Sequence, residues 1–179
     1  MAPTDKEAPP DMQEMMAVYQ KLGTPGVPHQ KMASLAGTWT TSTIAKLPSG
    51  ENSPPSPGQA EITMVLGGRY MRQDFHGEMM GYPFQGIGYT GYDNHTGQYV
   101  STWMDSMSTA IMYFTGAAAP DDRTFTQEAD YDDAVRGPMK WRSVTSLEDG
   151  DTFTFVMYVL PPGGEPDKMM EILYKRKKA

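Results

Sequence analysis

Apolar and polar residues alternate along most of the chain after residue 37, in strand-length runs separated by turn residues. This period of two is typical of antiparallel strands with one buried face. The clearest buried faces combine Ala60, Ile62, Met64 and Leu66; Phe125, Gln127, Ala129 and Tyr131; and Phe153, Phe155, Met157 and Val159. The pattern predicts strands over residues 38–46, 59–66, 69–76, 83–92, 98–105, 108–116, 123–131, 138–147, 152–160 and 168–177.

The connections between these runs are short and rich in turn residues, as in 93–97, 148–150 and 161–164. Strands joined in this way form a meander, and closing it removes the exposed edges of an open sheet. We therefore expect an all-β fold, an antiparallel up-and-down barrel of about ten strands with a short N-terminal helix. The one long break, from Leu47 to Gly58, is Pro-rich and is a candidate lid over one barrel end.

A helix is predicted ahead of the barrel. Asp11 and Glu14 have capping-box spacing, and Gly23 and Pro25 end the segment. Its apolar stripe consists of Met12, Met15, Met16, Tyr19 and Leu22. We expect this stripe to pack on the mouth or flank of the barrel. The predicted organisation is a disordered tail (1–10) and amphipathic helix in residues 1–27, followed by a barrel domain in residues 28–179.

Composition excludes several function classes. The chain has no cysteine, so disulfides, thiolate nucleophiles and cysteine metal sites are excluded. Its net charge of −7 argues against sequence-independent nucleic-acid binding. No apolar run is long enough to predict a membrane span. Met1 to Pro10 lack the features of a secretory signal, so we expect a cytoplasmic protein, although a mature secreted form would look the same. The oligomeric state is left open.

The Gly37-Thr38-Trp39 motif at the first strand and Arg176 on the last resemble the lipocalin and calycin pattern. That resemblance implies that Trp39 plugs the closed end of the barrel and that Arg176 packs across its indole, a cation–π contact of about 1 kcal/mol. Any ligand is then expected to enter from the opposite end.

More closely, the chain resembles an uncharacterised bacterial calycin-like family, domain of unknown function 1579. The segments that carry this resemblance are 29–32, 35–39, 66–70, 86–93, 100–105 and 168–172, within about residues 28–177. The family implies a fold and no activity. The related nitrobindin type binds haem through a histidine near its C-terminus, whereas no histidine follows His95 here. We therefore expect no haem and no other cofactor.

Other motifs have structural explanations. The Gly86-Ile87-Gly88-Tyr89-Thr90-Gly91 segment matches a dinucleotide fingerprint, but it lies in a Tyr-rich strand with no helix after it. His76 and His95 lie near turns, so no metal site is expected. Adjacent methionines point to opposite faces of a strand, which favours flexible core filling over a copper site.

The predicted inner wall is apolar and carries a few polar groups, as small-molecule pockets do. Its large or polar members are the candidate ligand-binding residues: Gln73, Trp103, Gln127, Tyr131 and Trp141. The leading hypothesis is a non-enzymatic barrel for a small hydrophobic or amphipathic ligand. One alternative is an isomerase or hydrolase that uses Asp105 or Glu171 inside the barrel. Another is a structural or interaction protein with a filled core, docking a partner through its helix or Pro-rich loop.

Overall fold

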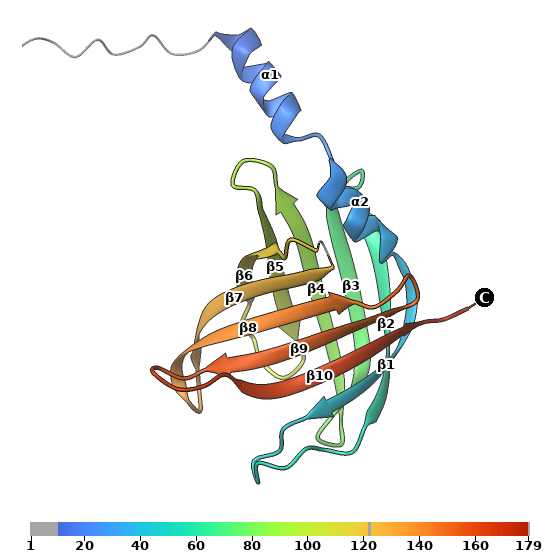
Figure 1. Cartoon of the computed structure of the whole chain (residues 1–179), viewed down its shortest axis with the longest axis vertical. Helices are drawn as coiled ribbons and strands as arrows, with labels where there is room; N and C mark the ends of the chain where they lie inside the picture. Colours follow the sequence, from blue (N-terminus) through green and yellow to red (C-terminus); the bar gives the residue numbers. More distant parts are fainter. Residues whose placement is uncertain (1–10, 122, 179) are drawn as a thin grey trace, which may run out of the picture.

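Ten antiparallel strands pair in sequence order, and the last pairs with the first to close a barrel, as the computed structural model shows for residues 11–121 and 123–178 (Figure 1). The strands are β1 (Gly37–Ala45), β2 (Ser56–Val65), β3 (Tyr70–Met79), β4 (Tyr82–Asp93), β5 (Gln98–Asp105), β6 (Met112–Ala118), β7 (Thr124–Asp133), β8 (Gly137–Leu147), β9 (Thr152–Leu160) and β10 (Asp167–Arg176). The predicted fold is confirmed. The tail predicted over residues 1–10 lies outside the described residues.

The pairing of β1 with β10 defines two barrel ends. Trp39 lies opposite Arg176 at one end, and Ala45 lies opposite Met170 toward the other. We call the first the Trp39 end; it also holds the turns that follow β2, β4, β6 and β8. We call the second the far end; it holds the connections that follow β1, β3, β5, β7 and β9.

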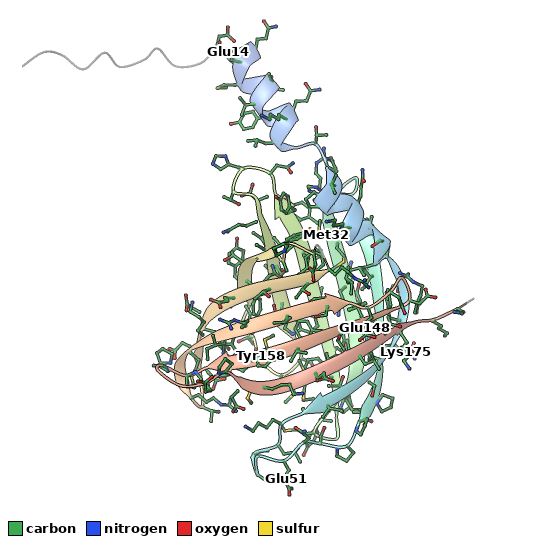
Figure 2. The ribbon with its side chains drawn as sticks, viewed as in Figure 1. Glu14, Met32, Glu51, Glu148, Tyr158 and Lys175 are labelled. Atoms are coloured by element: carbon green, nitrogen blue, oxygen red, sulfur yellow. The ribbon has the colours of Figure 1, made fainter. Side chains whose placement is uncertain are left out.

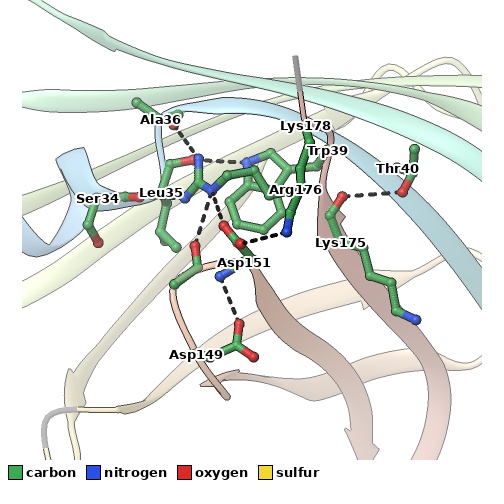
Figure 3. A network of polar contacts seen from close by, with 11 residues as sticks. Ser34, Leu35, Ala36, Trp39, Thr40, Asp149, Asp151, Lys175, Arg176 and Lys178 are labelled. Carbon is green, nitrogen blue, oxygen red and sulfur yellow. Dashed lines mark hydrogen bonds and ion pairs between the residues drawn. The ribbon is translucent and has the colours of Figure 1, made fainter.

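Trp39 is 1% exposed and lies at the centre of contacts from several segments (Figure 3). The Arg176 guanidinium carbon lies 4.2 Å from the centroid of the indole, and the Phe153 ring meets it edge-on at 4.7 Å. Its Nε1–H donates to the carbonyl of Leu35 at 2.9 Å. The tryptophan is therefore held by packing, a cation–π contact and a hydrogen bond together.

Arg176 also joins chain segments that are far apart in sequence. Its guanidinium donates to the carbonyls of Ser34, Ala36 and Gly150 at 2.8, 2.7 and 3.1 Å, and its Nε lies 3.2 Å from the Asp151 carboxylate (Figure 3). Gly37 has a φ of +138°, and a Cβ there would lie 2.7 Å from Nη1 of Arg176. The glycine of the Gly-x-Trp motif is thus explained by close approach of the arginine.

A second helix, α2 (Val27–Ser34), precedes β1 and was not predicted. His29 and Met32 are its buried residues, and the His29 ring meets Tyr92 edge-on. The Nδ1 of His29 accepts a hydrogen bond from the backbone N–H of Gly26 at 3.0 Å, so this histidine starts the helix in place of an ordinary capping residue.

The first helix, α1 (Met12–Leu22), has the predicted bounds and capping box. The expectation that its stripe packs on the barrel is wrong, because α1 has no buried residue and Met12, Met16 and Tyr19 are exposed. Figures 1 and 2 show α1, with Glu14 near its tip, leading away from the strands. Local capping holds α1 together, and Nδ2 of Asn94 donates to the carbonyl of Leu22, the last residue of α1, and to that of Thr24 just after it. No described helix is long and apolar enough to cross a membrane.

The structure differs from the sequence prediction at two further places, the end of β2 and the connection after β1. Leu66 does not continue the buried face of β2: it lies in a turn with a φ of +49° and is 71% exposed, because the chain reverses there before β3. The break after β1 is also shorter than predicted. Its residues pair with one another, as in the bridge of Lys46 with Asn52, and extend the hairpin to the tip at Glu51 (Figure 2).

Replacing Trp39 with Ala is expected to reduce the free energy of unfolding by about 3–5 kcal/mol, since a fully buried indole leaves a cavity and Arg176 loses its partner. Urea denaturation followed by circular dichroism measures this loss. Tyr113→Ala is the control, because Tyr113 is 58% exposed and its loss is expected to cost within about 0.5 kcal/mol. A fully stable Trp39→Ala variant contradicts the assignment of Trp39 as a plug.

His29 is expected to make stability depend on pH. Burial lowers its pKa from the ordinary value of 6.5, against a raising hydrogen bond to the Tyr92 backbone. The unfolded chain therefore takes up a proton at a higher pH than the folded chain does, and stability falls as the pH drops below about 6.5. The urea midpoint should fall more between about pH 7.5 and 5.5 for the native chain than for His29→Gln. Equal slopes for the two proteins would rule out this role.

Candidate binding site in the barrel lumen

The two halves of the lumen are packed differently. One half is a continuous cluster of buried side chains from β1 to β4, β9 and β10, made of Trp39, Ala60, Ile62, Phe75, Phe84, Phe153, Ile172 and Tyr174. The other half is lined by β5 to β8. There the register turns Ser101, Trp103, Gln127, Tyr131 and Trp141 inward, and all of them are only half-buried. Other inward residues of these strands, namely Tyr99, Phe114, Ala129 and Ser143, are buried, so the half-buried side chains occupy only part of this half.

Gln73 belongs to the packed half. Its Nε2 donates to the hydroxyl of Tyr174 at 3.1 Å, which links β3 to β10. The Tyr174 ring stacks on Phe153 with centroids 4.2 Å apart, and burial raises the pKa of its phenol, which keeps it neutral. This sequence-predicted residue thus has its donor paired within the protein.

Trp103 lies flat against β4 inside the barrel. A Cβ on Gly86 would lie 2.2 Å from the indole carbon Cζ2, and one on Gly88 would lie 3.0 Å from Cε3. The Nε1–H donates to the Asp105 carboxylate at 3.0 Å. The glycines that resemble a dinucleotide fingerprint therefore make room for an aromatic ring, as the sequence indicated.

Gln127 ends a chain of three hydrogen-bonded side chains. The Ser101 hydroxyl donates to Oε1 of Gln127 at 2.9 Å, and the Thr90 hydroxyl lies 3.0 Å from that of Ser101. The Ser101 hydroxyl therefore pairs with the oxygen of the Gln127 amide and not with its nitrogen, Nε2. That nitrogen is buried and has no hydrogen-bond partner.

Trp141 supplies a second unpaired donor close by. Trp141 lies on β8, opposite Ala129 of β7. Ser143, two residues further along β8, lies opposite Gln127 of β7. Gln127 and Trp141 are therefore diagonal neighbours on the same inner face, within reach of each other's long side chains. The indole Nε1 is also buried without a partner. Each buried donor without a partner lowers the folding stability by about 1–3 kcal/mol. Such donors are rare in folded proteins, so two on one inner face call for an explanation.

A shallow hollow lies at the far end of β7 and β8, mostly among outward-facing side chains. It has a volume of about 380 Å³ and is lined by Asp130, Tyr131, Asp132, Pro138, Met139 and Lys140. Tyr131 and Met139 lie opposite each other on β7 and β8 and face inward. The next inward pair is Ala129 with Trp141, and Gln127 follows. The hollow therefore lies at the end of the row of side chains that contains both unpaired donors.

The two carboxylates considered for catalysis lie in different places. Glu171 is on the outer face of β10, where Lys168 binds it at 2.8 Å. Asp105 is on the inner face of β5, and its oxygens accept from the indole of Trp103 and the backbone N–H of Met107 at 3.0 and 2.9 Å. Within the described ranges, no three His, Asp or Glu side chains are placed to hold a metal ion.

Sequence reasoning named four residues that the fold brings to this half of the lumen, namely Trp103, Gln127, Tyr131 and Trp141. It missed Ser101 as the partner of Gln127 and Met139 as the partner of Tyr131. Both lie at inward positions of alternating strands, so the period of two was the signal for them. The pairing of a donor with an acceptor depends on register and is not visible in the sequence.

Over residues 24–176 the sequence matches the family described as Protein of unknown function (DUF1579). A comparison with curated proteins finds no match. Among solved structures, the crystal structure of Rv2717c from M. tuberculosis is similar with a TM-score of 0.64 and 13% identity, covering 87% of this chain and 100% of that chain. That likeness shows the barrel fold.

Two designed proteins are also similar. A redesigned beta barrel has a TM-score of 0.43 and 16% identity, and covers 82% of this chain and 95% of its own. A de novo designed fluorescence-activating beta barrel has a TM-score of 0.45 and 12% identity, with 82% and 96% covered.

Gly86→Ala is expected to displace the Trp103 indole, because the new methyl group overlaps the ring. We expect a loss of about 1–3 kcal/mol in unfolding free energy and a shift in tryptophan emission. Gly150→Ala is the matched control, since nothing lies within 4 Å of a Cβ there. Denaturation and emission spectra of the two variants test the contact; identical behaviour would show that Trp103 does not rest on Gly86.

Proposed function

The chain belongs to the DUF1579 family, and from that premise we propose that its barrel binds a small amphipathic molecule beside Gln127 and Trp141. The family has no described activity, so the proposal depends on the site itself. Barrels of the lipocalin and calycin type, which the Gly-x-Trp and Arg motif resembles, use their lumen in this way.

The observation that carries the proposal is the pair of unpaired donors. Neither Nε2 of Gln127 nor Nε1 of Trp141 is exposed to solvent, so bulk water does not satisfy them. A bound acceptor recovers the cost of leaving them unpaired.

The surroundings of the donors suit an amphipathic molecule. Trp103 supplies an aromatic wall, Tyr131 lines the hollow at the far end, and Gln73 forms the polar boundary on the packed side. We propose these residues, with Gln127 and Trp141, as the ligand contacts. Entry at the far end agrees with the proposal that Trp39 and Arg176 plug the opposite end.

The alternatives have less support. Glu171 faces outward, and Asp105 holds the Trp103 indole and a backbone N–H, so no observation favours hydrolysis or isomerisation. An interaction role for the N-terminal helix rests on the exposed stripe of α1 and stays a prediction.

Nile red, a neutral dye whose emission rises in apolar surroundings, tests the proposal. We expect saturable binding of one dye per chain, weakened by filling the lumen through Ala129→Phe. Because the exposed stripe of α1 offers a competing surface, the control is the full chain with Met16→Gln and Tyr19→Gln, which should bind as the native chain does.

Native mass spectrometry of gently purified protein, with solvent extraction, complements the titration by detecting a co-purified molecule. Thermal melting checks that Ala129→Phe is folded, and Ser143→Leu is a second lumen-filling variant on the neighbouring strand. Binding that survives both fillings, or that disappears only in the α1 variant, would overturn the proposal.

A further inference from the structure

We propose that the lumen site selects molecules whose polar end is a neutral hydrogen-bond acceptor, such as an ester, ketone or amide carbonyl, over those that end in a carboxylate. This inference rests on the proposed function and adds the chemical class of the ligand. It follows from the charge of the groups that face the lumen.

The two free donors are both neutral. Trp141 offers an indole N–H and Gln127 an amide N–H, and neither group carries charge at any ordinary pH. A carbonyl oxygen has two lone pairs and accepts two such bonds at once. Because the donors come from diagonal positions of β7 and β8, one oxygen between them can meet both.

No cation is available to compensate a buried anion there. Among the described strand residues, the register turns a Lys or Arg inward only at Arg176, at the Trp39 end. The nearest cations in sequence, Lys140 and Arg142, lie on the outer face of β8, where Glu128 and Asp130 bind them. A carboxylate in the lumen would therefore lose its hydration without gaining an ion pair, which costs far more than burying a carbonyl.

The remaining inward charge is negative. Asp105 faces the lumen from β5, whereas Asp130, Asp132 and Lys140 lie on the outer face of β7 and β8. A carboxylate in the lumen would therefore meet the like charge of Asp105. A neutral ester or ketone meets neither penalty, and its apolar chain can extend past Met139 and Tyr131 toward the mouth.

The test is displacement of Nile red from the full chain by two matched competitors at about pH 8, where the acid is fully ionised. Methyl octanoate carries a neutral ester, and octanoate carries a carboxylate on the same chain. We expect the ester to displace the dye at a concentration at least about tenfold lower than the acid.

Removing a donor should then weaken the ester selectively. Trp141→Phe keeps an aromatic ring but lacks the N–H, and we expect about fivefold weaker displacement by methyl octanoate with octanoate unchanged. Gln127→Met is the second donor variant, should Trp141→Phe fail to fold. The matched controls are Trp39→Phe, whose N–H binds Leu35 at the closed end, and Gln59→Met on the outer face of β2. Both should displace as the native chain does.

Each outcome decides a separate question. If octanoate competes as well as the ester, or if both donor variants leave the ester unaffected, the neutral-acceptor inference is overturned while lumen binding stands. If Nile red does not bind in the lumen at all, the proposed function fails and this inference fails with it. A preference for the ester that shrinks about fivefold in the donor variants supports both.

Discussion

The pairing of β1 with β10 is the constraint on which the rest of the structure depends, because it converts a ten-strand meander into a barrel without edges. Arg176 reinforces this seam from the last residue of the last strand. Its guanidinium covers Trp39 and binds carbonyls of α2, the residues before β1 and the β8–β9 turn. One side chain thus closes the seam, covers one end of the barrel and fixes the short helix that precedes it.

Closure at that end leaves the lumen asymmetric. Around Trp39 the aromatic rings and the Gln73–Tyr174 bond fill the space between β3 and β10. On the opposite side, the Trp103 indole lies against Gly86 and Gly88 of β4 and donates to Asp105. The unpaired donors of Gln127 and Trp141 lie on β7 and β8. The proposed site therefore lies beside the packed cluster, against which Trp103 packs.

Sequence reasoning succeeded where a local rule decides the outcome. The period of two identified the inward faces of β7 and β9, and the Asp11–Glu14 spacing identified α1, because both depend on neighbouring residues alone. It failed where tertiary contacts override such rules. Leu66 continues the apolar alternation but lies in a left-handed turn, and α1 has an apolar stripe that meets no partner. The short helix α2 was missed because His29, rather than a usual capping residue, satisfies its first N–H.

By itself, the sequence determined the barrel: ten runs with one apolar face, short turns between them and a Gly-x-Trp motif leave few other ways to bury that face. It also determined which residues line the lumen, since alternation sends them inward. Only the tertiary structure decided which of those residues have their hydrogen-bonding groups paired. Gln73 and Gln127 are both glutamines on an apolar strand face. The register places the Tyr174 hydroxyl within reach of the Gln73 amide, whereas Nε2 of Gln127 has no partner. Hydrogen bonding between strands depends on distance and register across the barrel, which no local pattern encodes.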